Sequence, residues 1–337
     1  MEKDLETING ITYHLYSIKN HDIEISVCDY GATLCTFKYK GQDIVQGFEN
    51  VKGYMEEVPY MNATIGRCCN RIKDGEFTLN GQTYHVPINN GPNSLHGGIT
   101  GFDKVKWNIK VDTDKIVCEY LSVDKEEGYP GNVKVQVVYR LLAHGLEYSY
   151  EATSDQDTLL NICNHAFFNL NGPQSTTILN DHLTIYAHKI GIVDKDGCTL
   201  NDTLDVKDTP FDFTSRKTIG RDIMLDHLQL LNGNGYDHHY IIDGEGFRKF
   251  CEYDNDKLIL SVYSDLPGMH LYTGNYLDGQ AHGKNGGNYP ARSAVCFETQ
   301  YYPNAINCQD HLKPILNKGE KINHITQFII KEKDHEN

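Results

Sequence analysis

Residues 146–153 read LEYSYEAT, with an apolar or aromatic side chain at every second position. In an extended chain Leu146, Tyr148, Tyr150 and Ala152 would lie on one face, and the polar residues between them would lie on the other. This period of two predicts a half-buried β-strand.

Runs with the same period continue along the chain on both sides of this segment. They are ITYHLYSI (11–18), IEISV (23–27), KVQVVY (134–139), LTIYA (183–187), LILSVY (258–263) and HITQFII (324–330). Turn pairs separate such segments at Asn80-Gly81, Asp196-Gly197, Asp243-Gly244 and Asp278-Gly279. Helical periodicity is confined to about 48–56 and 220–231. Many short strands with few short helices predict an all-β fold in which sheets pack as a sandwich.

The chain shows no repeat and no linker rich in Pro, Gly or Ser. We therefore expect a single domain over 1–337, because one all-β domain can exceed 200 residues. The charged tail 331–337 (KEKDHEN) is expected to fray.

Composition limits the class of protein. The 337 residues include 31 basic and 46 acidic side chains, a net charge of −15, and 39% are hydrophobic, which is typical of a globular protein. The acidic excess argues against nucleic acid or an anionic membrane as a partner. No apolar run reaches the roughly 18–20 residues that span a bilayer, and MEKDLETING at the start resembles no secretory signal. We therefore expect a cytoplasmic protein whose ten cysteines, which form no CxxC pair, stay reduced.

The common cofactor motifs are absent from the sequence. There is no G-x-x-x-x-G-K-[ST], H-E-x-x-H or G-x-S-x-G. Residues 232–235 (NGNG) indicate a turn more than a nucleotide loop, and His238-His239 lacks further ligands at metal-binding spacing. We expect no metal and no cofactor.

Two polar residues stand where apolar ones are expected. His165 lies in LLNICNHAFFNL (159–170), where a strand would put it on one face with Cys163 and Phe167. Glu298 lies in AVCFETQ (294–300), and partial desolvation there would make it a better base. The alternative to a catalytic role is that His165 is a hydrogen-bonded core histidine. For Glu298 the alternative is that it points into water at the end of a strand.

Three glycine-rich segments carry further polar residues. They are GRCCNRI (66–72), NSLHGG (93–98) and GYDHHY (235–240). Arg71, His96 and Asp237 on loops of a rigid scaffold suit recognition of a polyhydroxylated ligand. The alternatives are that Arg71 forms a surface ion pair, that His96 is an ordinary turn residue, and that Asp237 forms an Asx-turn.

These segments resemble the aldose 1-epimerases, also called galactose mutarotases. The matches run in family order along the chain: GRCCNRI (66–72), NSLHGG (93–98), GFDKVKW (101–107), EGYPGN (127–132), NHAFFNL (164–170), GYDHHY (235–240), PGMHLYTGNYLDG (267–279) and ETQYYPNAIN (298–307). Together they cover nearly the whole chain. The resemblance implies a large, mostly antiparallel β-sandwich of the galactose-mutarotase type.

The resemblance also implies roles for individual residues. Glu298 matches the general base and His165 the general acid, which we expect on opposite sides of a sugar ring. Residues that match sugar-binding positions are Asn70, Arg71, His96, Asp237 and His270. Many relatives have Gln at the position of His270, which leaves the preferred sugar open.

The implied activity is the interconversion of α and β anomers of free hexoses, galactose and glucose first. The expected partner is an aldohexose, and we expect a monomer or a weak homodimer. One alternative is a hexose-6-phosphate mutarotase, for which Arg67, Arg71 and Lys284 would be the phosphate ligands. Another is a non-catalytic sugar-binding or sensor protein on the same fold.

Overall fold

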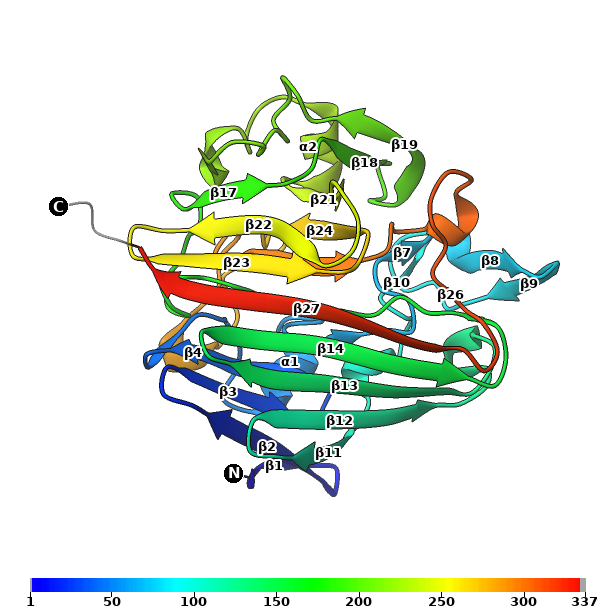
Figure 1. Ribbon diagram of the computed structural model, residues 1–337, viewed down its shortest axis with the longest axis horizontal. Helices are drawn as coiled ribbons and strands as arrows, with labels where there is room; N and C mark the ends of the chain where they lie inside the picture. The colour runs from blue at the N-terminus through cyan, green and yellow to red at the C-terminus, as the bar shows by residue number, and fades with distance from the viewer. Residues whose placement is uncertain (1, 334–337) are drawn as a thin grey trace.

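The largest sheet runs across the molecule and contains strands from both halves of the chain (Figure 1). The computed structural model describes residues 2–333. In spatial order the nine strands are β11 (Asn108–Val111), β12 (Lys115–Ser122), β13 (Val133–Leu142), β14 (Gly145–Ser154), β27 (Lys321–Glu332), β23 (Leu258–Ser264), β22 (Arg248–Asp254), β17 (His182–Ile185) and β20 (Lys217–Thr218). In Figure 1 the last strand, β27, crosses the middle of the sheet between β14 and β23.

Two five-stranded sheets accompany it. One is β1 (Glu2–Ile8), β2 (Ile11–Lys19), β3 (Ile23–Cys28), β4 (Thr33–Tyr39) and β5 (Gln42–Asp43). The other has the order β19 (Thr199–Asp205), β18 (Lys189–Val193), β21 (Asp237–Ile241), β24 (Gly268–Tyr272) and β25 (Cys296–Gln300). This second sheet carries three of the candidate site residues.

Short two-stranded sheets and helices complete the described chain. The strand pairs are β6 (Thr64–Ile65) with β16 (Cys163–Asn164), β7 (Arg71–Ile72) with β10 (Ser94–Leu95), β8 (Glu76–Leu79) with β9 (Gln82–His85), and β15 (Thr158–Leu159) with β26 (Ile315–Leu316). The α-helices of residues 2–333 are α1 (Val51–Glu56) and α2 (Leu228–Gly233). No helix in this part of the chain is long and apolar enough to cross a membrane.

The core lies between the inner faces of the sheets. In β14 the even-numbered residues 146–152 are buried, whereas Glu147, Ser149 and Glu151 are only partly buried. One hydrophobic cluster joins residues as distant in sequence as Tyr16 and Ile330. The predicted strand and the all-β sandwich are therefore confirmed, with antiparallel strand pairs throughout the ladders of residues 2–333. That 1–337 forms one domain stays a prediction.

The boundaries of two predicted segments are wrong. The helix expected at 220–231 begins only at Leu228, because the His227 ring accepts a hydrogen bond from the backbone N–H of Gln229 and caps the helix there. The tail was expected to fray from residue 331, but β27 runs to Glu332, and Lys333 forms an ion pair with Asp254. Residues 334–337 lie outside the described part of the chain.

The centre of the large sheet provides a test of this packing. Phe328 of β27 is 2% exposed, and its ring lies 5.0 Å from that of Phe168. Phe328→Ala should lower the free energy of unfolding by about 3–5 kcal/mol, because it leaves a cavity in the core. Urea denaturation measures the change. In the same strand, exposed Glu332→Ala should cost less than about 1 kcal/mol, and an equal loss in both variants would contradict the packing described.

Candidate active site

Three neighbouring strands place Asp237, His270 and Glu298 on one face of their sheet. His270 of β24 pairs directly with Glu298 of β25 on one side and with His239 of β21 on the other. Directly paired residues point to the same face, and Asp237 shares the face of His239 because it is two residues away. The strand register alone therefore brings the three side chains together.

Asp237 and His270 form a close pair. His270 Nε2 lies 2.6 Å from Asp237 Oδ1. Burial alone would raise the pKa of Asp237, but the hydrogen bond with His270 and the positive charges of His270 and Arg71 lower this pKa to about 2. Asp237 is therefore a carboxylate throughout the physiological range.

Glu298 and His165 form a second pair, which joins two different sheets. His165 follows the short strand β16, and its Nε2 lies 3.4 Å from Glu298 Oε1. The exposed fractions are 6% for His165 and 1% for Glu298. The strand predicted around His165 is limited to Cys163–Asn164, but His165 still stacks on Phe167 at a centroid distance of 5.2 Å. A sugar ring cannot fit into a 3.4 Å gap, so the expectation that the two groups lie on opposite sides of it is wrong.

Asn70 and His96 hold each other through reciprocal bonds. The Asn70 N–H donates to His96 Nδ1 at 3.1 Å, and the His96 N–H donates to the Asn70 carbonyl at 3.1 Å. Burial, and next the charge of His165, hold the pKa of His96 well below its ordinary value. His96 is therefore neutral, and because Nδ1 accepts a bond, Nε2 carries the proton.

Arg71 of β7 lies beside the same residues. Its Nε donates to Asn90 Oδ1 at 3.0 Å. A side chain at Gly197, where φ is +76°, would come within 2.9 Å of the guanidinium carbon. Glycine at this turn thus leaves room for Arg71.

All of these side chains line one cavity of about 440 Å³. It contains each candidate proposed from the sequence: Asn70, Arg71, His96, His165, Asp237, His270 and Glu298. Its volume is within the usual range for small-molecule sites. The wall also has an aromatic part, which comprises Tyr60, Phe167, Tyr272 and Tyr276, and of these only Phe167 was expected from the sequence to lie near His165. A Tyr-rich segment such as 267–279 was the available signal.

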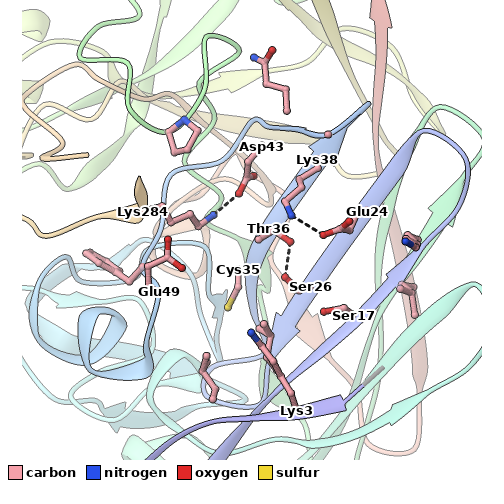
Figure 2. Close-up of a pocket in the computed structure, with 18 of the residues that line it drawn as sticks. Lys3, Ser17, Glu24, Ser26, Cys35, Thr36, Lys38, Asp43, Glu49 and Lys284 are labelled. Atoms are coloured by element: carbon pink, nitrogen blue, oxygen red, sulfur yellow. Dashed lines mark hydrogen bonds and ion pairs between the residues drawn. The ribbon is translucent and has the colours of Figure 1, made fainter. Parts of the chain in front are cut away.

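A larger cleft of about 1010 Å³ lies elsewhere, against the outer face of β2–β4 (Figure 2). Four of its charged side chains form two ion pairs, Lys284 with Asp43 at 2.9 Å and Lys38 with Glu24 at 2.7 Å. None of the histidines within residues 2–333 lines it. It therefore offers no acid–base pair comparable to Glu298 and His165.

The donor groups around Glu298 fit a metal poorly. One potential ligand atom each from His96, His165 and Glu298 lie within 4.8 Å of one another. A neutral imidazole has a single ring lone pair, and that of His96 accepts the Asn70 N–H. His238 has its Nδ1 bonded to the Asp237 N–H and its Nε2 3.2 Å from Gln229 Oε1. The chemistry of the donors thus favours proton transfer over metal binding.

The fold and this cavity define a β-sandwich protein with a buried acid–base site, and comparison with known proteins identifies the family. A sequence model of the family "Aldose 1-epimerase" matches residues 14–328. The chain is 38% identical over 326 residues to galactose mutarotase of Bos taurus, with 94% of each chain covered. It is 31% identical over 334 residues to aldose 1-epimerase of Escherichia coli, with 95% of this chain and 96% of the other covered.

A solved structure is similar over nearly the full length. Galactose 1-epimerase from Lactobacillus acidophilus superimposes with a TM-score of 0.88 at 26% identity, and 98% of each chain is covered. This chain belongs to the aldose 1-epimerase family. The roles of the individual site residues remain proposals.

The Asp237–His270 pair predicts a pH-dependent contribution to stability. The pKa of Asp237 is about 2 in the folded protein and lower than its ordinary value of 3.8, so the carboxylate stabilises the fold above about pH 4. This stabilisation, roughly 2 kcal/mol, is lost as the pH falls toward 2. Asp237→Asn should be less stable than the wild type by about this amount at pH 7, with a gap that narrows below pH 4.

Urea denaturation between pH 3 and pH 7 measures this gap. Asp226 is exposed, and Asp226→Asn is the matched control, which should change stability by less than about 0.5 kcal/mol at any pH. A gap for Asp237→Asn that stays constant with pH would refute the role of the pair.

Proposed function

We propose that this protein interconverts the α and β anomers of free aldohexoses, galactose and glucose first, by opening and closing the sugar ring. The observation that carries the proposal is the buried contact between Glu298 and His165, with 3.4 Å between carboxylate oxygen and imidazole nitrogen. Membership of the aldose 1-epimerase family supports it.

The two groups can serve two adjacent atoms of the sugar. Glu298 removes the proton from the C1 hydroxyl while His165 protonates the ring oxygen, and the bond between C1 and the ring oxygen breaks. The aldehyde then rotates about the C1–C2 bond. On closure Glu298 returns its proton to the new hydroxyl oxygen, and His165 takes its proton back from the closing hydroxyl. The ring oxygen and the C1 hydroxyl oxygen are both bonded to C1, so an acid and a base that lie next to each other can reach these two oxygens at the same time.

The other polar groups suit the hydroxyls of the ring. His96 presents a donor at Nε2, because its Nδ1 is occupied. Arg71 has further N–H donors besides the one bound to Asn90. Asp237 is an ionised acceptor even with one oxygen bonded to His270. We propose that these residues, with Asn70 and His270, bind the sugar.

The geometry favours an unphosphorylated hexose over a hexose 6-phosphate. The guanidinium of Arg67 is buried and donates to Ser122 and to the carbonyls of Val123 and Pro130. Lys284 lines the other cleft and pairs with Asp43. Of the three expected phosphate ligands, only Arg71 lines the site cavity.

A non-catalytic sugar sensor is less well supported. Burying a carboxylate and an imidazole in contact costs desolvation free energy, which hydroxyl recognition alone does not require. We also propose a cytoplasmic location and a monomer or weak homodimer. The ten buried thiols suit a reducing compartment.

Polarimetry on freshly dissolved α-D-glucose and α-D-galactose tests the proposed function. The protein should bring each sugar to its equilibrium rotation faster than buffer alone, at a rate proportional to protein concentration. Unchanged rates with both sugars, together with saturable sugar binding, would favour the sensor.

Substitutions of the acid and the base should abolish most of this activity. A positioned acid or base typically contributes roughly 10²–10⁴-fold to the rate. Glu298→Gln and His165→Asn should each reduce kcat on that scale, while circular dichroism shows the fold retained. Exposed Glu320→Gln and His21→Asn are matched controls that should keep full activity. Near-normal activity of either site variant would remove that residue from its role.

The rate should depend on pH in a bell shape. Catalysis needs Glu298 ionised and His165 protonated, so kcat/KM should fall at low pH as the base is lost and at high pH as the acid is lost. Since the groups are in contact, both limbs belong to the pair. A flat profile from about pH 4 to 10 would contradict the pairing.

A further inference from the structure

A thiol lies directly behind the carboxylate of Glu298. Cys163 Sγ donates to Glu298 Oε2 at 3.7 Å, while Oε1 of the same carboxylate faces His165. Cys163 is 0% exposed and Glu298 1% exposed. The two residues come from β16 and β25, separated by 135 positions in sequence.

Cys163 stays protonated and can act as the donor. Burial, followed by the neighbouring Cys69 and Glu298, raises the pKa of the Cys163 thiol well above its ordinary value. Cys69 uses its own S–H elsewhere, in a bond to Gln300 Oε1 at 3.0 Å. The S–H of Cys163 therefore donates to the Glu298 carboxylate, which is the strongest acceptor beside it.

We propose that Cys163 is a positioning residue for the general base, a thiol that fixes the orientation of the Glu298 carboxylate while leaving it more basic than a hydroxyl or amide donor would. This inference rests on the proposed function, since it assigns Glu298 as the base.

The physical reason is the weakness of the S–H donor. Hydrogen bonds to a carboxylate stabilise its ionised form and make it a poorer proton acceptor. An O–H or N–H donor does this strongly, whereas S–H is a weak donor of similar shape. A base that must take a proton from a sugar hydroxyl gains from being held in place without losing basicity.

Other titratable and charged groups also surround Glu298 and stay unchanged in the test. They are His165 after β16, Cys69 before β7, His96 after β10, Arg71 on β7, Asp237 on β21, His270 on β24 and Cys296 on β25. A substitution at Cys163 therefore changes one contact of the carboxylate and one contact of the neighbouring Cys69, while the other residues around Glu298 are kept.

Two substitutions should move the acidic limb of the kcat/KM profile in opposite directions. Cys163→Ser supplies a stronger donor, so the limb should move to lower pH by roughly half a unit to one unit, with a lower kcat at the plateau. Cys163→Ala removes the donor, so the limb should move to higher pH by a similar amount. Cys118→Ser, at a buried cysteine of β12 in another sheet, is the matched control and should leave the limb in place.

A second measurement makes the result independent of turnover. In protein labelled with ¹³C at the glutamate carboxyls, the Glu298 signal, assigned by its loss in Glu298→Gln, should titrate with the same opposite shifts. Equal titration of Glu298 in wild type, Cys163→Ser and Cys163→Ala would overturn the inference, as would shifts in one direction. If Cys163→Ser does not fold, then an unchanged Glu298 titration in Cys163→Ala is enough to overturn the inference.

If the wild type has no mutarotase activity but the Glu298 signal shifts in opposite directions in the two variants, the proposed function is refuted and the positioning role of Cys163 is not.

Discussion

The contact between a buried carboxylate and a buried imidazole, Glu298 with His165, is the constraint on which the site depends. Such a pair is costly to desolvate and is stable only when surrounding groups hold it in place. The structure provides them on each side: Cys163 behind the carboxylate, Phe167 against the imidazole face, and the backbone of Ala63, whose carbonyl accepts the His165 N–H. Removing one partner would leave the other buried without its counterpart, so the two residues act as a unit.

The β-sandwich holds this pair in register through strand pairing. Glu298 is fixed by β25 against β24, and His165 by the short pairing of β16 with β6. The second pair, Asp237 with His270, comes from the same sheet as Glu298, so the ionised carboxylate that we propose as an acceptor for sugar hydroxyls has a fixed position relative to the proposed base. His165, the proposed acid, by contrast comes from outside that sheet, and its position relative to Glu298 depends on the packing of β16 against β25.

Local patterns were sufficient to predict much of the fold, whereas the candidate site residues were singled out by local patterns together with the family resemblance, and their roles stay predictions. Apolar and polar residues alternate in the sequence of 146–153 because the inward-facing residues of β14 are buried and the outward-facing ones are only partly buried. The start of α2 was not predicted because its N-cap is the side chain of His227, and histidine is an uncommon N-cap residue. The contacts His165–Glu298 and Cys163–Glu298 bridge more than 130 residues and different sheets, so no periodicity could reveal them. The neutral state of His96 likewise depends on burial and on Asn70.

The central claim is that Glu298 and His165 open the ring and never cleave the exocyclic C1–O1 bond. Methyl β-D-galactoside tests it most directly, because it retains the other hydroxyls but has no proton on the C1 oxygen. The protein should leave this glycoside unchanged in a proton NMR experiment, under conditions where it equilibrates the anomers of free galactose. Release of methanol at a rate comparable to that equilibration would contradict the account and indicate a glycosidase with the same two groups.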